Sequence, residues 1–317
     1  MAALRIIFMG TAELSCASLE VLARHQQFQV VCVVTQPDKP KGRKLKSQLS
    51  PVKVLAERLK LPVQQPLKAR DETFISELRA LNPDLIVVVA YGQILPQAIL
   101  DLPRHGCLNV HTSLLPKYRG AAPIQWAIAT GETETGVTIM KMDVGLDTGP
   151  IILQQRTAIQ AEDDSATLHD RLAQLGAELL VQTIPDYITG KIKPNPQPVA
   201  GVSLAPKIKK EDGWIDWNRP AVEIWNRFRA FTPWPGSYTF LPADPKSHLV
   251  KIWKMEAVEE SGKPGTILSS DKNGIVVGCG VNAVRVLELQ REGGKRLTAA
   301  QFLTGFPLPP GLNVLAI

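Results

Sequence analysis

The segment DLIVVVA, from Asp84 to Ala90, constrains the fold most, because its apolar side chains would point to both faces of a strand. Such a strand is typical of a parallel sheet that helices cover on both sides. Two more strand-like runs, LRIIFMG and FQVVCVVTQ, flank a segment of helical spacing from Ala12 to Arg24. Strands that alternate with helices indicate βαβ units. We therefore expect an α/β domain with a Rossmann-like parallel sheet.

This first domain should extend over residues 1–189. The segments CLNVH and GVTIMKM predict further strands of the same sheet. A helix is expected from about Ser165 to Ile188, where leucines and an isoleucine recur at helical spacing, and Ser165 should be its N-cap.

The pattern changes after this helix. The stretch TGKIKPNPQPVAG holds three prolines in five residues, which predicts a linker over residues 190–206. Short strand-like runs separated by glycine-bearing turns follow, and they predict a smaller, mostly β domain over residues 207–317, similar to an OB-like barrel. A chain of 317 residues is long enough for two domains.

The loop after the first strand argues against a nucleotide cofactor. A dinucleotide-binding turn needs three glycines, so that the pyrophosphate can approach the backbone. The stretch MGTAELSCAS offers only Gly10, and Glu13 would repel a phosphate. The phosphate-binding pattern GxxxxGK[ST] is also absent from the sequence. We therefore do not expect NAD or a nucleoside triphosphate to bind.

Cysteine usage and hydropathy indicate a cytoplasmic location. The four cysteines are scattered and form no CxxC pair, which is typical of reduced core thiols and not of a disulfide framework or a zinc site. No window of eighteen apolar residues predicts a membrane span, and the N-terminal residues do not resemble a signal peptide. We expect a cytoplasmic monomer without a bound metal.

Three polar residues suggest a site for acyl transfer. Asn109 and His111 are two residues apart near the end of a predicted strand, so their side chains should share one face. Asp147 lies in the loop MDVGLDTGP after the next predicted strand. An amide can stabilise an oxyanion, an imidazole can move a proton, and a carboxylate can orient the imidazole. Alternatively, His111 is a structural histidine of the core.

A basic segment points to a polyanionic partner. DKPKGRKLKSQLSPVK, from Asp38 to Lys53, contains six cations and one acid, although a solvated loop would look the same. Residues 207–317 carry 15 Lys and Arg against 11 Asp and Glu, a net charge of +4 out of +6 for the whole chain.

The stretch NVHTSLLPKYRGAAPIQWAI, followed by GETETGVTIMKMDVGLDTGP, closely resembles the folate-dependent formyltransferases. FMGTAE, the basic segment and RAFTPWPGSYT are similar to other parts of that family. One departure is Ala12, where the family usually has proline.

The resemblance implies that 10-formyltetrahydrofolate donates a formyl group to the amino group of methionine on initiator tRNA. It assigns catalysis to Asn109, His111 and Asp147. It also implies a wall against the folate and a basic loop that binds tRNA. The wall would comprise Ser113, Leu114, Leu115 and Pro116, and the loop contacts would come from Lys41, Arg43, Lys44 and Lys46. Residues 207–317 would bind tRNA as well.

Three other functions remain open at this point. A glycinamide ribonucleotide formyltransferase would explain only the first domain. A sugar-nucleotide formyltransferase carries a second domain, but RGAAPIQ and the basic loop argue against it. A protein that only binds RNA would leave Asn109, His111 and Asp147 unexplained.

Overall fold

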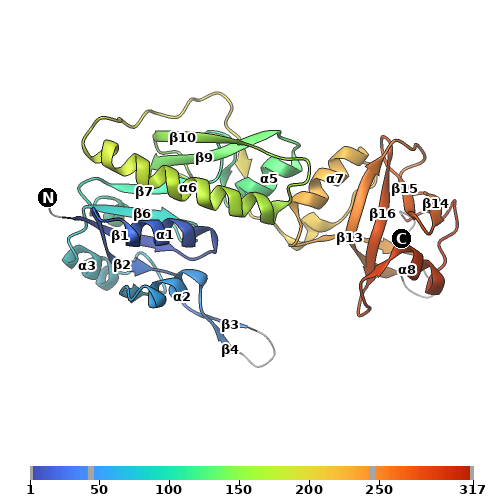
Figure 1. Ribbon diagram of the computed structural model, residues 1–317, viewed down its shortest axis with the longest axis horizontal. Coiled ribbons are helices and arrows are strands. Elements are labelled where there is room, and N and C mark those ends of the chain that lie inside the picture. The colour runs from blue at the N-terminus through green and yellow to red at the C-terminus, as the bar shows by residue number, and fades with distance from the viewer. Residues whose placement is uncertain (1–2, 42–45, 243–246, 315–317) are drawn as a thin grey trace. The chain divides into compact units, whose positions relative to one another are not determined.

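The computed structural model describes residues 3–41, 46–242 and 247–314 (Figure 1). The chain forms two compact units, each of which is considered by itself. The first unit consists of Met1–Pro123, Glu134–Ala158 and Leu168–Ala205, and the second of Ile124–Thr133, Ile159–Thr167 and Pro206–Ile317. Among the described residues, no helix is both long and apolar enough to cross a lipid bilayer.

The first unit is built on a seven-stranded sheet with the order β10-β9-β7-β6-β1-β2-β5. Its strands are β1 (Leu4–Gly10), β2 (Phe28–Val34), β5 (Val63–Gln64), β6 (Leu85–Val89), β7 (Cys107–His111), β9 (Glu134–Lys141) and β10 (Ile151–Ala158). The five neighbouring strands β7, β6, β1, β2 and β5 are parallel, which confirms the expected Rossmann-like α/β fold. The prediction was wrong for β9, which pairs with β7 in antiparallel orientation, and β10 was not predicted.

Helices cover both faces of this sheet. They are α1 (Leu14–Arg24), α2 (Pro51–Arg58), α3 (Glu72–Ala80), α4 (Gln97–Leu100) and α6 (Ser165–Ile188). All five residues of β6 are buried, as its two apolar faces predicted. Gly176 of α6 packs against Val110, so α6 covers the face to which Val110 points. Asn109 and His111 alternate with Val110 along β7 and therefore point to the opposite face.

The bounds of α6 match the prediction, but its N-cap lies one residue earlier than expected. Ser165 is the first helical residue, and its hydroxyl donates to the carbonyl of Thr232. The cap is Asp164, because its carboxylate accepts hydrogen bonds from the backbone N–H groups of Ala166 and Thr167, both at 2.9 Å.

The second unit is mostly antiparallel β, as expected. Its sheet contains β12 (Ser237–Leu241), β13 (His248–Val258), β16 (Ala283–Arg291), β15 (Gly274–Gly278), β14 (Ile267–Asp271) and β17 (Leu297–Thr298). The turn η1 (Lys210–Gly213) and the helices α5 (Pro123–Ala129), α7 (Ala221–Ala230) and α8 (Ala299–Gly305) complete the helical elements. Two short segments that precede Pro206 in the sequence, Ile124–Thr133 and Ile159–Thr167, also belong here. Trp126 meets Phe231 edge to face, and Arg229 donates to the carbonyl of Asp163 at 2.8 Å.

Residues 190–206, expected to be a linker, pack on the first unit up to Ala205. Strand β11 (Leu204–Ala205) pairs in parallel with β8 (Arg119–Gly120). Asn195 exchanges two backbone hydrogen bonds with Ile151, at 2.7 and 2.8 Å. The segment is therefore close to the loop between β9 and β10, which carries Asp147.

Candidate active site

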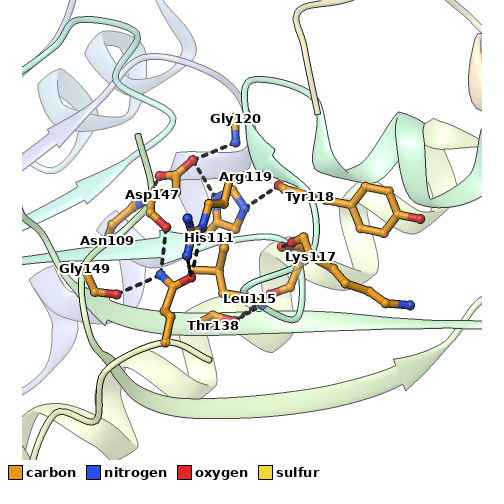
Figure 2. A network of polar contacts seen from close by, with 12 residues as sticks. Asn109, His111, Leu115, Lys117, Tyr118, Arg119, Gly120, Thr138, Asp147 and Gly149 are labelled. Carbon is orange, nitrogen blue, oxygen red and sulfur yellow. Dashed lines mark hydrogen bonds and ion pairs between the residues drawn. The ribbon is translucent and has the colours of Figure 1, made fainter. Parts of the chain in front are cut away.

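The structure brings Asn109, His111 and Asp147 together (Figure 2). Asn109 and His111 point to one face of β7, where His111 is the last residue. The Nδ2 atom of Asn109 lies 3.4 Å from Oδ1 of Asp147, and Nδ1 of His111 lies 3.7 Å from Oδ2 of the same carboxylate. An amide donor, an imidazole and a carboxylate thus surround one point, as the sequence suggested.

The loop of Asp147 reaches this point by an unexpected route. Because β9 runs antiparallel to β7, its last residue, Lys141, pairs with Leu108. The loop therefore starts beside β7 and folds back, instead of leaving from the carboxyl edge of a parallel strand. Asp143 fixes its shape by accepting hydrogen bonds from the backbone of Gly145 at 3.0 Å and from the hydroxyl of Thr148 at 2.7 Å.

A backbone donor also holds the Asp147 carboxylate. The N–H of Gly120 donates to Oδ2 at 2.8 Å, the shortest contact of this carboxylate among its three neighbours (Figure 2). Gly120 has a φ of +125°, and an added Cβ atom would lie 2.7 Å from the carbonyl oxygen of Ala205. Glycine is required at this position because any side chain would collide with β11.

His111 is buried, with 5% of its surface exposed. Its Nε2 atom lies 3.0 Å from the carbonyl oxygen of Tyr118. A carbonyl only accepts, so Nε2 must carry a proton, and the neutral ring then leaves Nδ1 free to accept one. Tyr118 is itself held in place, because its N–H donates to the hydroxyl of Ser203 at 2.9 Å.

The four residues expected to face the folate lie directly after β7. Thr138 binds the backbone here, accepting from Leu115 N–H and donating to the carbonyl of Ser113. Gln154 donates to the carbonyl of Leu115 at 2.9 Å, so Ser113 and Leu115 use these groups inside the unit. Leu114 and Pro116 are half-buried and leave carbon surface for a ligand. Folate contact by this segment stays a prediction.

The basic segment forms a hairpin of β3 (Lys39–Lys41) and β4 (Lys46–Gln48). Arg43 and Lys44 lie outside the described residues, and the side chains of Lys41 and Lys46 are not described either. At the root of the hairpin, Lys53 donates to Asp38 at 2.7 Å. The hydrogen bond from Lys53 lowers the pKa of Asp38. One of the six predicted cations is therefore paired beside the hairpin.

The cysteines take no part in this site. All four are free, and burial raises the pKa of Cys16 to about 11 and those of Cys32, Cys107 and Cys279 to about 12. A thiol with such a pKa is a poor nucleophile near neutral pH. Within the described ranges, no group of three His, Cys, Asp or Glu residues could hold a metal ion.

The sequence did not reveal the residues that support the site. Tyr118 and Gly120 act through backbone atoms, which leave no side-chain signal in a sequence. Gln197 donates to the carbonyls of Asp147 and Gly149, but it lies in a proline-rich stretch that predicted a linker. The glycine in RGAAP was the one visible hint of a close backbone approach.

Comparisons with known proteins place both halves of the chain. Residues 4–184 match the family described as Formyl transferase, and residues 207–307 match Formyl transferase, C-terminal domain. The chain is 53% identical to a methionyl-tRNA formyltransferase of Citrifermentans bemidjiense, covering 98% of this chain and 96% of that protein. A methionyl-tRNA formyltransferase of Myxococcus xanthus is 52% identical, with 97% and 96% covered.

Solved structures share the fold at low sequence identity. The sugar 3N-formyl transferase WlaRD, solved in the presence of dTDP and 5-N-formyl-THF, is 20% identical and has a TM-score of 0.64. The similarity covers 90% of this chain and 98% of that one. HypX from Aquifex aeolicus in complex with tetrahydrofolic acid is 19% identical, with a TM-score of 0.61 over 96% of this chain and 48% of that one.

Proposed function

This chain belongs to the formyl transferase family, and we propose that it transfers the formyl group of 10-formyltetrahydrofolate to the α-amino group of methionine on initiator tRNA. The observation that carries the choice of acceptor is the identity of about 50% to methionyl-tRNA formyltransferases over nearly the whole chain, both domains included. The choice of donor is supported by the family and by relatives of the same fold that were solved with folates.

In the proposed reaction, the neutral amine attacks the formyl carbon. A bond forms between the amine nitrogen and that carbon. The bond from the carbon to N10 of the folate then breaks, and N10 takes up a proton as tetrahydrofolate leaves. Asn109 donates its amide N–H to the formyl oxygen as negative charge develops there. Nδ2 carries two hydrogens, so it can serve this oxygen while it remains near Asp147.

His111 and Asp147 handle the proton in this proposal. The attacking amine becomes positively charged and must lose a proton before the product is released. Nδ1 of the neutral His111 can accept it directly or through water, because Tyr118 holds the other ring proton on Nε2. The imidazolium that results faces Oδ2 of Asp147 at 3.7 Å, which stabilises its charge.

The binding roles follow from the same proposal. The folate lies against Leu114 and Pro116, and the β3–β4 hairpin contacts the tRNA through Arg43 and its neighbouring lysines. Residues 1–189 carry catalysis and residues 207–317 bind tRNA, with residues 190–206 between them. We further propose that the protein works as a monomer in the cytoplasm and needs no metal.

The acceptor decides between this function and its rivals. The experiment compares kcat/KM with 10-formyltetrahydrofolate for three acceptors: charged initiator tRNA, an amino sugar linked to dTDP, and glycinamide ribonucleotide. We expect activity with the tRNA that exceeds the others by at least about a thousandfold, since a mismatched acceptor loses many contacts. Equal or greater activity with a small amine would overturn the proposal, and tRNA binding without transfer would favour a protein that only binds RNA.

A further inference from the structure

The side-chain amide of Gln197 holds the loop that carries Asp147 through hydrogen bonds. Its Nε2 atom donates to the carbonyl of Asp147 at 2.7 Å and to the carbonyl of Gly149 at 2.8 Å. Its Oε1 atom accepts from Nε and Nη2 of Arg119, at 3.1 and 2.7 Å. A guanidinium only donates and a carbonyl only accepts, so the orientation of the Gln197 amide is unambiguous.

Apart from the hydrogen bonds of Asp143 within the loop and of Gly120 to the Asp147 carboxylate, the loop has little support, because apolar packing near its tip is sparse. Val144 and Leu146, near its tip, are 67% and 63% exposed and contribute little to packing. Asp147 has a φ of +51°, a left-handed conformation that is uncommon outside glycine, although aspartate adopts it more readily than most residues do. A backbone held in this state returns to a more common conformation unless its surroundings fix it. Gln197 binds the carbonyl of that same residue.

The same amide also binds the segment that supports the site through Tyr118 and Gly120. Arg119, which donates hydrogen bonds to Gln197, lies between these two residues. Tyr118 orients the imidazole of His111, and Gly120 donates to the carboxylate of Asp147 (Figure 2). The amide of Gln197 therefore ties the Asp147 backbone to the segment that holds both reacting side chains.

We propose that Gln197 is a positioning residue for formyl transfer that acts through Asp147. This inference rests on the proposed function. Gln197 does not touch the substrates in this role; it holds the Asp147 carboxylate at His111 and Asn109. Misplacing a reacting group by about 1 Å can cost roughly a hundredfold in rate.

Two substitutions distinguish the hydrogen bonds of the Gln197 amide from simple packing of its side chain. Gln197→Ala removes every contact of the amide. Gln197→Glu keeps the acceptor for Arg119 but loses both donors and places a carboxylate beside two carbonyl oxygens. We expect either variant to lower kcat by roughly 10- to 100-fold. The KM for the folate and the Kd for tRNA should stay within about twofold. Gln182→Ala, an exposed glutamine on α6, is the matched control and should behave as wild type.

A double-mutant cycle then tests the route through Asp147. In an Asp147→Ala background, Gln197→Ala should cause no further loss of kcat, because the group it positions is gone. Losses that multiply in the double variant, or a Gln197→Glu enzyme with wild-type kcat, would overturn the inference. If Asp147→Ala alone kept wild-type turnover, the proposed catalytic role of Asp147 would fail as well, so the two failures are distinguishable. Thermal unfolding of each variant shows whether it is folded.

Discussion

The Nε2 atom of His111 lies 3.0 Å from the carbonyl oxygen of Tyr118, and this contact fixes which ring nitrogen carries the proton. The neutral imidazole must be the Nε2–H tautomer. Its Nδ1 atom then faces the Asp147 carboxylate at 3.7 Å, too far for a direct hydrogen bond but close enough for charge stabilisation. Proton transfer in the proposed reaction therefore uses Nδ1.

A glutamine at position 111 tests this assignment. The amide of His111→Gln can still donate to the carbonyl of Tyr118, but it has no counterpart of Nδ1. We expect thermal stability near that of wild type and a turnover at least about a hundredfold lower, the range for loss of a general acid–base group. Nitrogen NMR of the wild-type imidazole at alkaline pH should show the Nε2–H tautomer. A proton on Nδ1 would contradict the assignment.

Gly120 should tolerate no side chain. Gly120→Ala places a Cβ atom 2.7 Å from the carbonyl oxygen of Ala205 and shifts the N–H that binds Asp147. We expect a loss of stability on the order of 2–3 kcal/mol and a lower kcat. Gly201→Ala is the control, because Gly201 also has a positive φ, +81°, but its Cβ would meet nothing within 4 Å. Equal kcat values for the two variants would show that the close approach does not matter.

The cysteines should react slowly with alkylating reagents in the folded protein. Burial favours the neutral thiol, so the pKa of Cys16 is raised to about 11. At pH 8 such a thiol is about one part in a thousand thiolate, against roughly a quarter for an ordinary cysteine. The rate of iodoacetamide labelling at Cys16 should rise about tenfold per pH unit from pH 8 to 10. Mass spectrometry monitors the labelling, and rapid modification of Cys16 at pH 8 would contradict its raised pKa.

Affinity for tRNA should fall steeply with salt. Contacts between cations and phosphates release counterions, so log Kd should be linear in log salt concentration. Arg43→Ala should reduce that slope by about one and leave the KM for the folate unchanged. Filter binding of the intact chain measures the slope. Cutting the chain near Gly201 to remove the second unit would not isolate the tRNA contacts, because the cut also removes Ser203 and β11, which support the active site. An affinity independent of salt would count against phosphate contacts.

The elements with a strong periodic signal could be predicted. DLIVVVA is apolar on both faces and forms the central strand β6, and leucines at helical spacing predicted the bounds of α6. The grouping of Asn109, His111 and Asp147 could be predicted from their side-chain types and from their positions at the ends of predicted strands. The catalytic roles proposed for these residues rest on the family resemblance.

What the sequence hid depends on contacts between distant backbone atoms. The direction of β9 could not be predicted, because alternation of side chains is the same in a parallel and an antiparallel strand. Residues 190–206 suggested a linker from their prolines, but their hydrogen bonds to Ile151 and Arg119 arise only in the folded chain. Asp164 was missed as a cap because Ser165 beside it is an equally good candidate.

Single-turnover formylation of charged initiator tRNA by wild type and Asn109→Ala tests the central claim most directly. With enzyme in excess and both substrates saturating, the rate of the chemical step should fall about a hundredfold in the variant, because one oxyanion donor is lost. The Kd values for folate and tRNA should hardly change, since this hydrogen bond strengthens mainly in the transition state. A chemical step at the wild-type rate in folded Asn109→Ala would contradict the account.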